Sequence, residues 1–243
     1  MSTLYLIATP IGNLEDITLR AMRVLGEVDA LACEDTRRTR ILFEKHGIKS
    51  PSLIFSYREH NEEQAGRRIL GLINDGKSVG ICSDAGYPGI SDAGYRIVAD
   101  AVEKGVHVEV IPGAGAVSVA LLSSGLSTSS YTYKGFPPRK GGARRRFLSM
   151  EKDLPHTLVL FESPFRIGAL LEDAYAVLGN RKAAVCLELT KKFEETSRGG
   201  LKDLAEKFKG KQPKGEITVV ISGNNPKFLD EDDEAGGNDD DGE

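Results

Sequence analysis

Short apolar segments alternate with helical segments through the first half of the chain, and this alternation constrains the fold more than any other feature. Strands are expected at 4–8, 30–33, 53–55, 79–82 and 108–111, and helices at 18–25, 36–46, 61–75, 92–104 and 115–124. Strands that are separated by single helices favour parallel pairing, because parallel neighbours need a crossover connection. The pattern predicts an N-terminal α/β domain over residues 1–124 with a doubly wound, parallel five-stranded sheet.

A second α/β domain is expected over residues 131–225, after a small polar linker at 125–130. Its pattern is less regular and predicts a mixed sheet. The expected strands are 132–135, 157–161, 184–189 and 217–222, and the expected helices are 142–150, 164–178 and 201–208. The helix that begins at Asn61 carries Gln64 at the position of a capping box.

The net charge of −4 comes from the C-terminal segment. Residues 230–243 hold nine acids and no base, so the segment 226–243 is predicted to be a disordered acidic tail. Without those nine acids the chain has 27 acidic and 32 basic residues, a net charge of about +5. A mildly basic body is compatible with a nucleic-acid partner.

The composition indicates a globular protein of the cytoplasm. Hydrophobic residues make up 40% and charged residues 28% of the chain, and no apolar run approaches the roughly 20 residues that span a bilayer. Cys33, Cys82 and Cys186 fall in or at the ends of expected strands, as core residues in a reducing compartment would. The four histidines lack metal-ligand spacing, so no metal is expected.

The loop at 82–92 follows a buried strand and holds the best candidate for a ligand site. Open α/β sheets bind ligands at the carboxyl ends of their strands. Gly86 allows close approach of the backbone, and Ser83 and Asp84 offer a hydroxyl and a carboxylate. The alternative is a plain loop in which Asp92 caps the next helix.

Two further loops occupy equivalent positions. Residues 112–116, Pro-Gly-Ala-Gly-Ala, follow a strand and open an apolar helix, which suits an adenosyl ligand; tight strand–helix packing is the alternative. Residues 9–14 follow the first strand, where a plain turn is the alternative. Residues 71–78 match the P-loop expression, but they end a helix and start a strand, the reverse of the order that phosphate binding needs.

Two charged segments complete the candidates. Glu34, Asp35 and Arg37 follow the strand at 30–33 and can orient a substrate or accept a proton, or Asp35 can simply cap the next helix. The second segment is a basic cluster without acids, which suits RNA phosphates; a solvated surface is the alternative. Its members are Arg139, Lys140, Arg144, Arg145 and Arg146.

Several of these segments together resemble the ribosomal RNA methyltransferase branch of the tetrapyrrole (corrin and porphyrin) methylase family. The resemblance runs in consistent order from Leu4 to Gly223. The matching segments are 4–20, 33–37, 83–91, 111–116, 135–140, 160–166 and 188–194. Ser83-Asp84-Ala85 stands where corrin enzymes carry Gly-Asp-Pro, which argues against a tetrapyrrole substrate.

The resemblance implies two α/β domains, a homodimer, and S-adenosylmethionine in the cleft between the domains. The implied reaction is methyl transfer to the ribose 2′-hydroxyl of a cytidine in 16S ribosomal RNA. Members commonly carry an additional helical region, where this chain has its acidic segment. The cofactor residues that it implies are Pro10, Asp84, Gly86, Tyr87, Gly115, Ala116, Leu160, Phe161, Gly215, Glu216 and Ile217.

A ribose hydroxyl is a weak nucleophile, so an acceptor for its proton is expected. The candidates are Asp35, Glu34 and Lys191, the last only if burial lowers its pKa. Arg37 and the basic cluster are expected to hold the RNA backbone. A tetrapyrrole methyltransferase and a non-catalytic RNA-binding module are the alternative functions.

Overall fold

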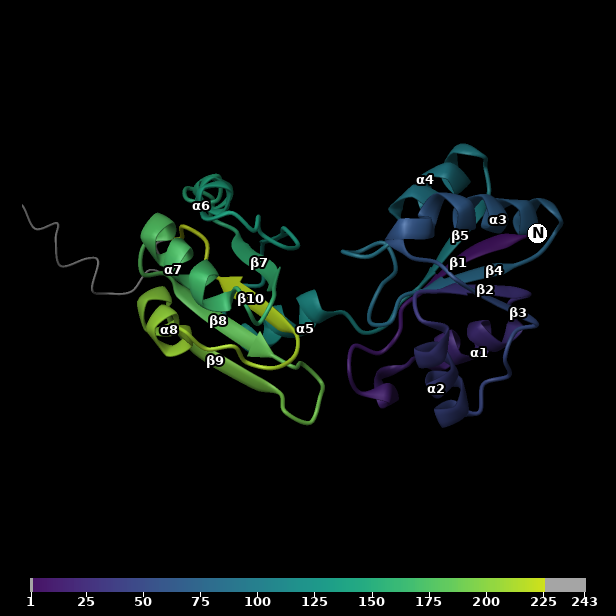
Figure 1. Cartoon of the computed structure of the whole chain (residues 1–243), viewed down its shortest axis with the longest axis horizontal. Coiled ribbons are helices and arrows are strands. Elements are labelled where there is room, and N and C mark those ends of the chain that lie inside the picture. Colours follow the sequence, from purple (N-terminus) through teal and green to yellow (C-terminus); the bar gives the residue numbers. More distant parts are fainter. Residues whose placement is uncertain (1, 226–243) are drawn as a thin grey trace, which may run out of the picture. The chain divides into compact units, whose positions relative to one another are not determined.

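The computed structural model describes residues 2–225, in two compact units (Figure 1). The first unit ends at Ala116 and the second begins at Val117. The expected linker at 125–130 therefore falls within the second unit, after its first helix. The predicted disorder of the acidic segment 226–243 lies outside the described residues.

The first unit is built on a five-stranded sheet with the strand order β3-β2-β4-β1-β5, in which every pair is parallel. This confirms the doubly wound sheet. The strands are β1 (Thr3–Ile7), β2 (Ala30–Cys33), β3 (Leu53–Ser56), β4 (Val79–Cys82) and β5 (His107–Ile111). The helices between them are α1 (Leu19–Glu27), α2 (Thr36–His46), α3 (Glu62–Asn74) and α4 (Tyr95–Glu103), with short 3₁₀ turns η1 (Leu14–Asp16) and η2 (Glu59–Asn61).

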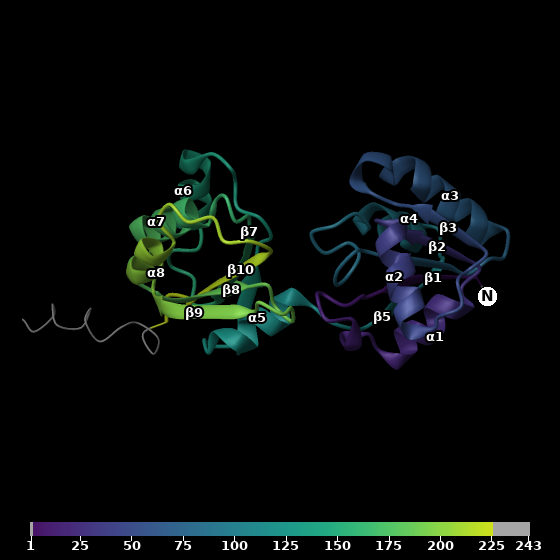
Figure 2. The same cartoon turned by 60° about the horizontal axis from the view of Figure 1, so that its bottom comes forward.

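Alternating side chains of the strands divide the first core into two layers. Leu4 and Leu6 of β1 pack with α3 and α4 on one face, whereas Ile7 packs with α1 and α2 on the other. Figure 2 shows the two helix pairs on opposite faces of the sheet. Because both faces are covered, the central strands β2 and β4 are buried throughout and carry no charged side chain, as buried parallel strands do.

The second unit holds a five-stranded sheet with the order β6-β7-β10-β8-β9. Only β6 and β7 are parallel, so the sheet is mixed, as predicted. Its strands are β6 (Tyr131–Tyr133), β7 (Thr157–Glu162), β8 (Lys182–Leu187), β9 (Glu195–Gly200) and β10 (Ile217–Ile221). Its helices are α5 (Ala116–Ser124), α6 (Gly141–Ser149), α7 (Ile167–Leu178) and α8 (Leu201–Phe208).

Helices α6, α7 and α8 share one hydrophobic core with the inward side chains of β7, β8 and β10. Helix α5 lies against the sheet by another contact, because the Cys186 thiol is 4.0 Å from the Ala120 carbonyl oxygen. All three cysteines are buried and unbridged, as expected of core residues. Within residues 2–225, no helix has the length and apolar character that crossing a bilayer requires.

Three local predictions need correction. Strand β9 was not predicted, because its residues include two glycines and few apolar side chains. Asn61 makes no capping bond to α3, since its side chain bonds the backbone of Ser56 and Arg58 instead. Helix α4 starts at Tyr95 with Gly94 as its N-cap, so Asp92 does not cap it.

Candidate functional site

Three loops of the first unit meet at the carboxyl ends of β1, β4 and β5. Thr9 and Gly86 form an isolated antiparallel bridge in which each backbone N–H donates to the other carbonyl, at 2.9 and 3.0 Å. The Thr9 hydroxyl donates to the Ser83 carbonyl at 3.1 Å. The Ala8 N–H donates to the Ile111 carbonyl at 3.1 Å. The loops at 9–14, 83–91 and 112–116 are therefore joined by hydrogen bonds.

Tyr87 joins the second of these loops to the third. Its hydroxyl accepts from the Gly113 N–H at 3.0 Å and lies 3.3 Å from the Gly113 carbonyl oxygen, to which it donates. A Cβ at Gly113 would approach the Cβ of Ala8 to 3.0 Å, so only glycine lets the chain pass this close to β1. The backbone from Gly113 to Ala116 stays partly exposed. Together these loops form a cradle of backbone groups that a ligand can reach.

Six of the residues implied for cofactor binding gather in or beside this cradle. They are Pro10, Asp84, Gly86, Tyr87, Gly115 and Ala116. Pro10 is buried, directly after the bridging Thr9. Gly115 lies 3.5 Å from the Tyr87 ring, measured from its ideal Cβ position, and Ala116 begins α5.

At the end of β2, Asp35 is the N-cap of α2, and its carboxylate accepts from the Arg37 N–H at 2.9 Å. The Arg37 guanidinium binds the same carboxylate at 3.1 and 2.8 Å. These side-chain and backbone hydrogen bonds hold the pKa of Asp35 well below its usual range. The capping role is confirmed, and such a carboxylate is a weak acceptor for a proton.

Asp84 links the ends of β2 and β4. Its carboxylate accepts from the Asp35 N–H at 3.0 Å and lies 3.4 Å from an Arg38 guanidinium nitrogen. The Asp84 N–H donates to the Glu34 carboxylate at 3.2 Å. Burial raises the pKa of Asp84, and the charge of Glu34 adds to the effect.

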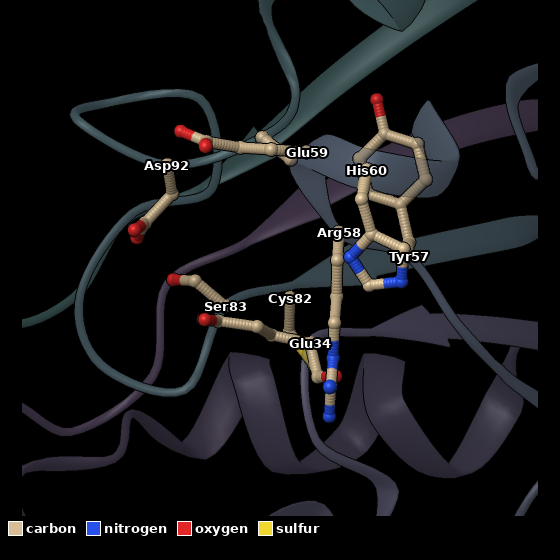
Figure 3. A pocket seen from close by; sticks show the side chains of 9 residues that line it. Glu34, Tyr57, Arg58, Glu59, His60, Cys82, Ser83 and Asp92 are labelled. Carbon is tan, nitrogen blue, oxygen red and sulfur yellow. The ribbon is translucent and has the colours of Figure 1, made fainter. Parts of the chain in front are cut away.

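Beside this cluster the first unit has a pocket of about 230 Å³ (Figure 3). It is lined by Glu34, Tyr57, Arg58, Glu59, His60, Cys82, Ser83, Asp92 and Ala93. In Figure 3, Asp92 and Ser83 lie on one side and Arg58, His60 and Tyr57 on the other. Arg58 is held in place because its Nε donates to the Glu34 carbonyl at 2.6 Å.

Asp92 is the site residue that sequence reasoning assigned to a cap instead. Burial raises its pKa to about 6, and the charge of Glu34 contributes. The preceding residue, Ser91, has a φ of 61°, a left-handed conformation that serine seldom adopts and that is enriched at functional sites. The only sequence signal was a second acid in a glycine-rich loop.

In the second unit, three implied cofactor residues lie on adjacent strands. Phe161 of β7 pairs with Thr218 of β10, and Ile217 pairs with Glu162. Leu160 is fully buried in the core of the unit. Phe161 is partly exposed and makes edge contacts with the rings of Tyr133 and Phe136.

Lys191 lies near the other implied residues of this unit. Its ammonium binds Glu188 at 2.8 Å and Glu216 at 3.1 Å. Burial lowers the pKa of Lys191, but these hydrogen bonds outweigh it, so the pKa is raised above its usual value. The condition under which Lys191 would be a base is not met. Gly215 has a φ of 92° beside Glu188, which leaves no room for a side chain.

The basic cluster of the second unit divides into exposed and buried members. Arg139, Lys140, Arg145 and Arg146 are exposed. The Arg144 side chain is 7% exposed, and its guanidinium binds the Asp173 carboxylate at 2.6 and 2.7 Å. Contrary to the expectation of a solvent-facing cation, Arg144 is engaged inside the unit and attaches α6 to α7. Within the described residues, no cluster of histidine, cysteine and acidic side chains is arranged to hold a metal ion.

Comparison with known proteins decides the family. The family profile described as Tetrapyrrole (Corrin/Porphyrin) Methylases matches residues 3–205. The chain belongs to the tetrapyrrole methylase family. Among its relatives is a protein of Micromonospora olivasterospora named ribosomal RNA small subunit methyltransferase I, 47% identical over 95% of this chain and 73% of that protein.

Two other relatives carry the same name. The protein of Halalkalibacterium halodurans is 44% identical over 93% of this chain and 77% of its own length. The protein of Thermotoga maritima is 44% identical over 92% of this chain and 99% of its own length. About a quarter of the Micromonospora and Halalkalibacterium proteins lies outside the segment that aligns with this chain, but almost none of the Thermotoga protein does. A region beyond the aligned segment is therefore not common to all three relatives.

Solved structures support the fold of a tetrapyrrole methylase. A conserved hypothetical protein of Aeropyrum pernix matches 92% of this chain and 85% of its own with a TM-score of 0.71 at 17% identity. A uroporphyrin-III C-methyltransferase of Thermus thermophilus, solved in complex with S-adenyl homocysteine, matches 90% of this chain and 97% of its own with a TM-score of 0.61 at 18% identity. At these identities the likeness concerns the fold alone.

Proposed function

We propose that the chain is an S-adenosylmethionine-dependent methyltransferase that modifies the ribose 2′-hydroxyl of a cytidine in 16S ribosomal RNA. The observation that carries this proposal is the hydrogen-bonded cradle at β1, β4 and β5, in a chain 44–47% identical to three proteins named ribosomal RNA small subunit methyltransferase I. The sequence identity to solved corrin and porphyrin methyltransferases is only 18–21%, which favours the RNA substrate over a tetrapyrrole.

The cradle fits an adenosyl group because its glycines leave backbone N–H and carbonyl groups within reach. Asp84 would hold a hydroxyl or the amino group, and Gly86, Tyr87, Gly115 and Ala116 would shape the adenosyl site. Leu160, Phe161, Gly215, Glu216 and Ile217 remain predicted cofactor contacts from the second unit. When bound, S-adenosylmethionine supplies a methyl group attached to a positively charged sulfur.

The chain's own residues must align the acceptor hydroxyl and take its proton. Glu34 and Asp92 suit the proton transfer better than Asp35, whose charge is neutralised by Arg37, and better than the ion-paired Lys191. We assign the proton to Asp92, because an acceptor is most effective when its pKa is near the working pH. Asp92 and Ser83 share one side of the pocket, and Ser83 is bonded to the cradle through Thr9.

RNA phosphates would be held by Arg139, Lys140, Arg145 and Arg146, with Arg37 as a further contact. Alanine at Arg139 and Lys140 together should weaken RNA binding and reduce the slope of log K against log salt by about 0.7 for each lost single-strand contact. Equilibrium binding at several salt concentrations measures this. An unchanged slope would remove these residues from the RNA site, while cofactor affinity should stay the same in either case.

Calorimetry with S-adenosylmethionine tests the central claim. Wild-type protein should bind it, and Asp84→Ala should bind at least tenfold more weakly, whereas Asp75→Ala, an exposed acid at the end of α3, should bind normally. Circular dichroism of each variant confirms folding. Folded wild-type protein that binds no cofactor would refute the proposal. A ribosomal substrate also implies a cytoplasmic protein, and the expected homodimer is testable by light scattering.

A further inference from the structure

The pocket beside the cradle is too small for a whole cofactor. Pockets for drug-sized ligands enclose roughly 300–1,000 Å³, whereas this one encloses about 230 Å³. It borders the cradle at Ser83, whose hydroxyl lies 3.3 Å from the Gly86 carbonyl oxygen and whose carbonyl accepts from Thr9. A compound bound here would lie next to the cradle rather than in it.

The lining of the pocket presents both an acceptor and a donor of hydrogen bonds. One Glu34 oxygen, Oε2, accepts the Asp84 N–H, which orients the carboxylate and leaves Oε1 as an acceptor for a ligand. The Arg58 Nε donates to the Glu34 carbonyl, and its Nη2 lies 3.8 Å from an oxygen of the Asp35 carboxylate, so Nη1 is the donor that we assign to a ligand. A carboxylate and a guanidinium thus both line the pocket, and His60 lies on the same side of it as Arg58 (Figure 3).

This pair matches the Watson–Crick edge of one pyrimidine. Cytosine has an amino group that donates and a ring nitrogen and carbonyl that accept, whereas uracil has a carbonyl in place of the amino group. Carboxylates accept from the cytosine amino group, and arginine donates to base acceptors. A uracil carbonyl would instead face the Glu34 carboxylate, so two acceptors would meet without a proton between them.

We infer that this pocket of the first unit binds the base of the acceptor cytidine, with Glu34 accepting from the cytosine amino group and Arg58 donating to the carbonyl oxygen at the other end of the same edge. The inference rests on the proposed function. It changes the role of Glu34 from a candidate proton acceptor to a specificity-determining residue. The base would have to leave its stack to enter, as bases do in other enzymes that modify nucleic acids, and His60 would supply a surface for stacking.

Binding of cytidine 5′-monophosphate and uridine 5′-monophosphate to the full chain tests the inference without any methyl transfer. NMR titration should show the cytidine nucleotide shifting the Asp84 amide and the Arg58 Nε–H signals at millimolar concentration. The uridine nucleotide should bind about tenfold more weakly or worse, as loss of a matched base contact implies. No shift at these signals, or equal affinity for the two nucleotides, would overturn the inference.

The E34Q variant provides the decisive comparison. Its amide oxygen can still accept the Asp84 N–H, and its amino group then replaces the free acceptor with a donor. The preference should invert toward the uridine nucleotide. The matched control is E63Q, because Glu63 is 79% exposed on α3 and outside the pocket; it should keep the preference for cytidine. Retained cytidine preference in folded E34Q would also overturn the inference.

The calorimetric experiment on S-adenosylmethionine separates the two proposals. If the cofactor binds and the nucleotides do not discriminate, the base pocket is wrong and the methyltransferase assignment stands. If the nucleotides discriminate as expected and the cofactor does not bind, the pocket is a cytidine site in a protein with another activity.

Discussion

The ends of β2 and β4 are neighbours in one sheet, and both present carboxylates, yet Asp35 at one end and Asp92 at the other differ in acid strength. After β2, Asp35 caps a helix and binds the Arg37 guanidinium, so its pKa is lowered. After β4, Asp92 caps no helix and lies partly buried near Glu34, so its pKa is raised to about 6. Position at a strand end therefore does not decide whether an acid can act as a base. The burial of the carboxylate and the hydrogen bonds that it accepts do.

The largest expected effect comes from removing the proposed base. Asp92→Asn should lower the single-turnover rate of methyl transfer by roughly 10²–10⁴-fold, because the acceptor hydroxyl loses its proton acceptor. Asp35→Asn should change the rate much less. Rapid-quench measurement with radiolabelled S-adenosylmethionine distinguishes the two.

The pH profile sharpens this comparison. Wild-type rate should rise with pH through an inflection near 6, the pKa of Asp92, and the inflection should be missing in Asp92→Asn. If Asp35→Asn were the slow variant and Asp92→Asn the fast one, the two strand ends would exchange roles.

The next effect concerns stability. Between the usual aspartate pKa of 3.8 and about 6, folded Asp92 binds more protons than unfolded Asp92, so stability falls as pH rises through this window. Asp92→Asn removes that cost and should stabilise the protein by about 1–3 kcal/mol at pH 8, the lower values reflecting solvent contact of the carboxylate. Thermal unfolding at pH 8 and pH 4 measures it.

The stabilisation should disappear near pH 4, where the wild-type carboxyl is protonated. Asp100→Asn, on the exposed side of α4, is the matched control and should behave like the wild type at both values. Equal unfolding temperatures for Asp92→Asn and wild type at pH 8 would contradict the raised pKa, because they would mean that the charged Asp92 carboxylate is as stable in the folded protein as in water.

The smallest effect has the opposite sign. The lowered pKa of Asp35 contributes stability above the usual value of 3.8, and that contribution is lost as pH falls below it. Asp35→Asn should therefore lower the unfolding temperature at pH 7, by less than Asp92→Asn raises it, because asparagine still caps helices well. A rise instead would contradict the assigned pairing with Arg37.

Local sequence predicted the elements better than it predicted the site. Strand β2 and helix α2 have the expected bounds. The signals that fix them, which are the apolar residues and the capping residues, all lie within the segment itself. The raised pKa of Asp92 depends on burial and on Glu34, which follows a different strand and is brought near only by the parallel pairing of β2 with β4. The spacing of residues along the chain does not predict that these two carboxylates are close.

The basic cluster shows the same limit. Five cations in eight residues predict a single exposed basic surface. Helical geometry instead turns Arg144 inward, where Asp173 of α7 binds it. Nothing near Arg144 in the sequence distinguishes it from Arg145. The partner lies 29 residues away and becomes visible only once α6 and α7 pack together.

The bridge between Thr9 and Gly86 has a consequence for the rate and the affinity of ligand binding. It continues the pairing of the sheet into two loops that would otherwise move independently. The conformational entropy of these loops is therefore lost when the protein folds, at roughly 1–2 kcal/mol for each fixed residue, and not when a ligand arrives. A cradle assembled in advance admits its ligand without waiting for a loop to order, and its affinity is not reduced by that ordering.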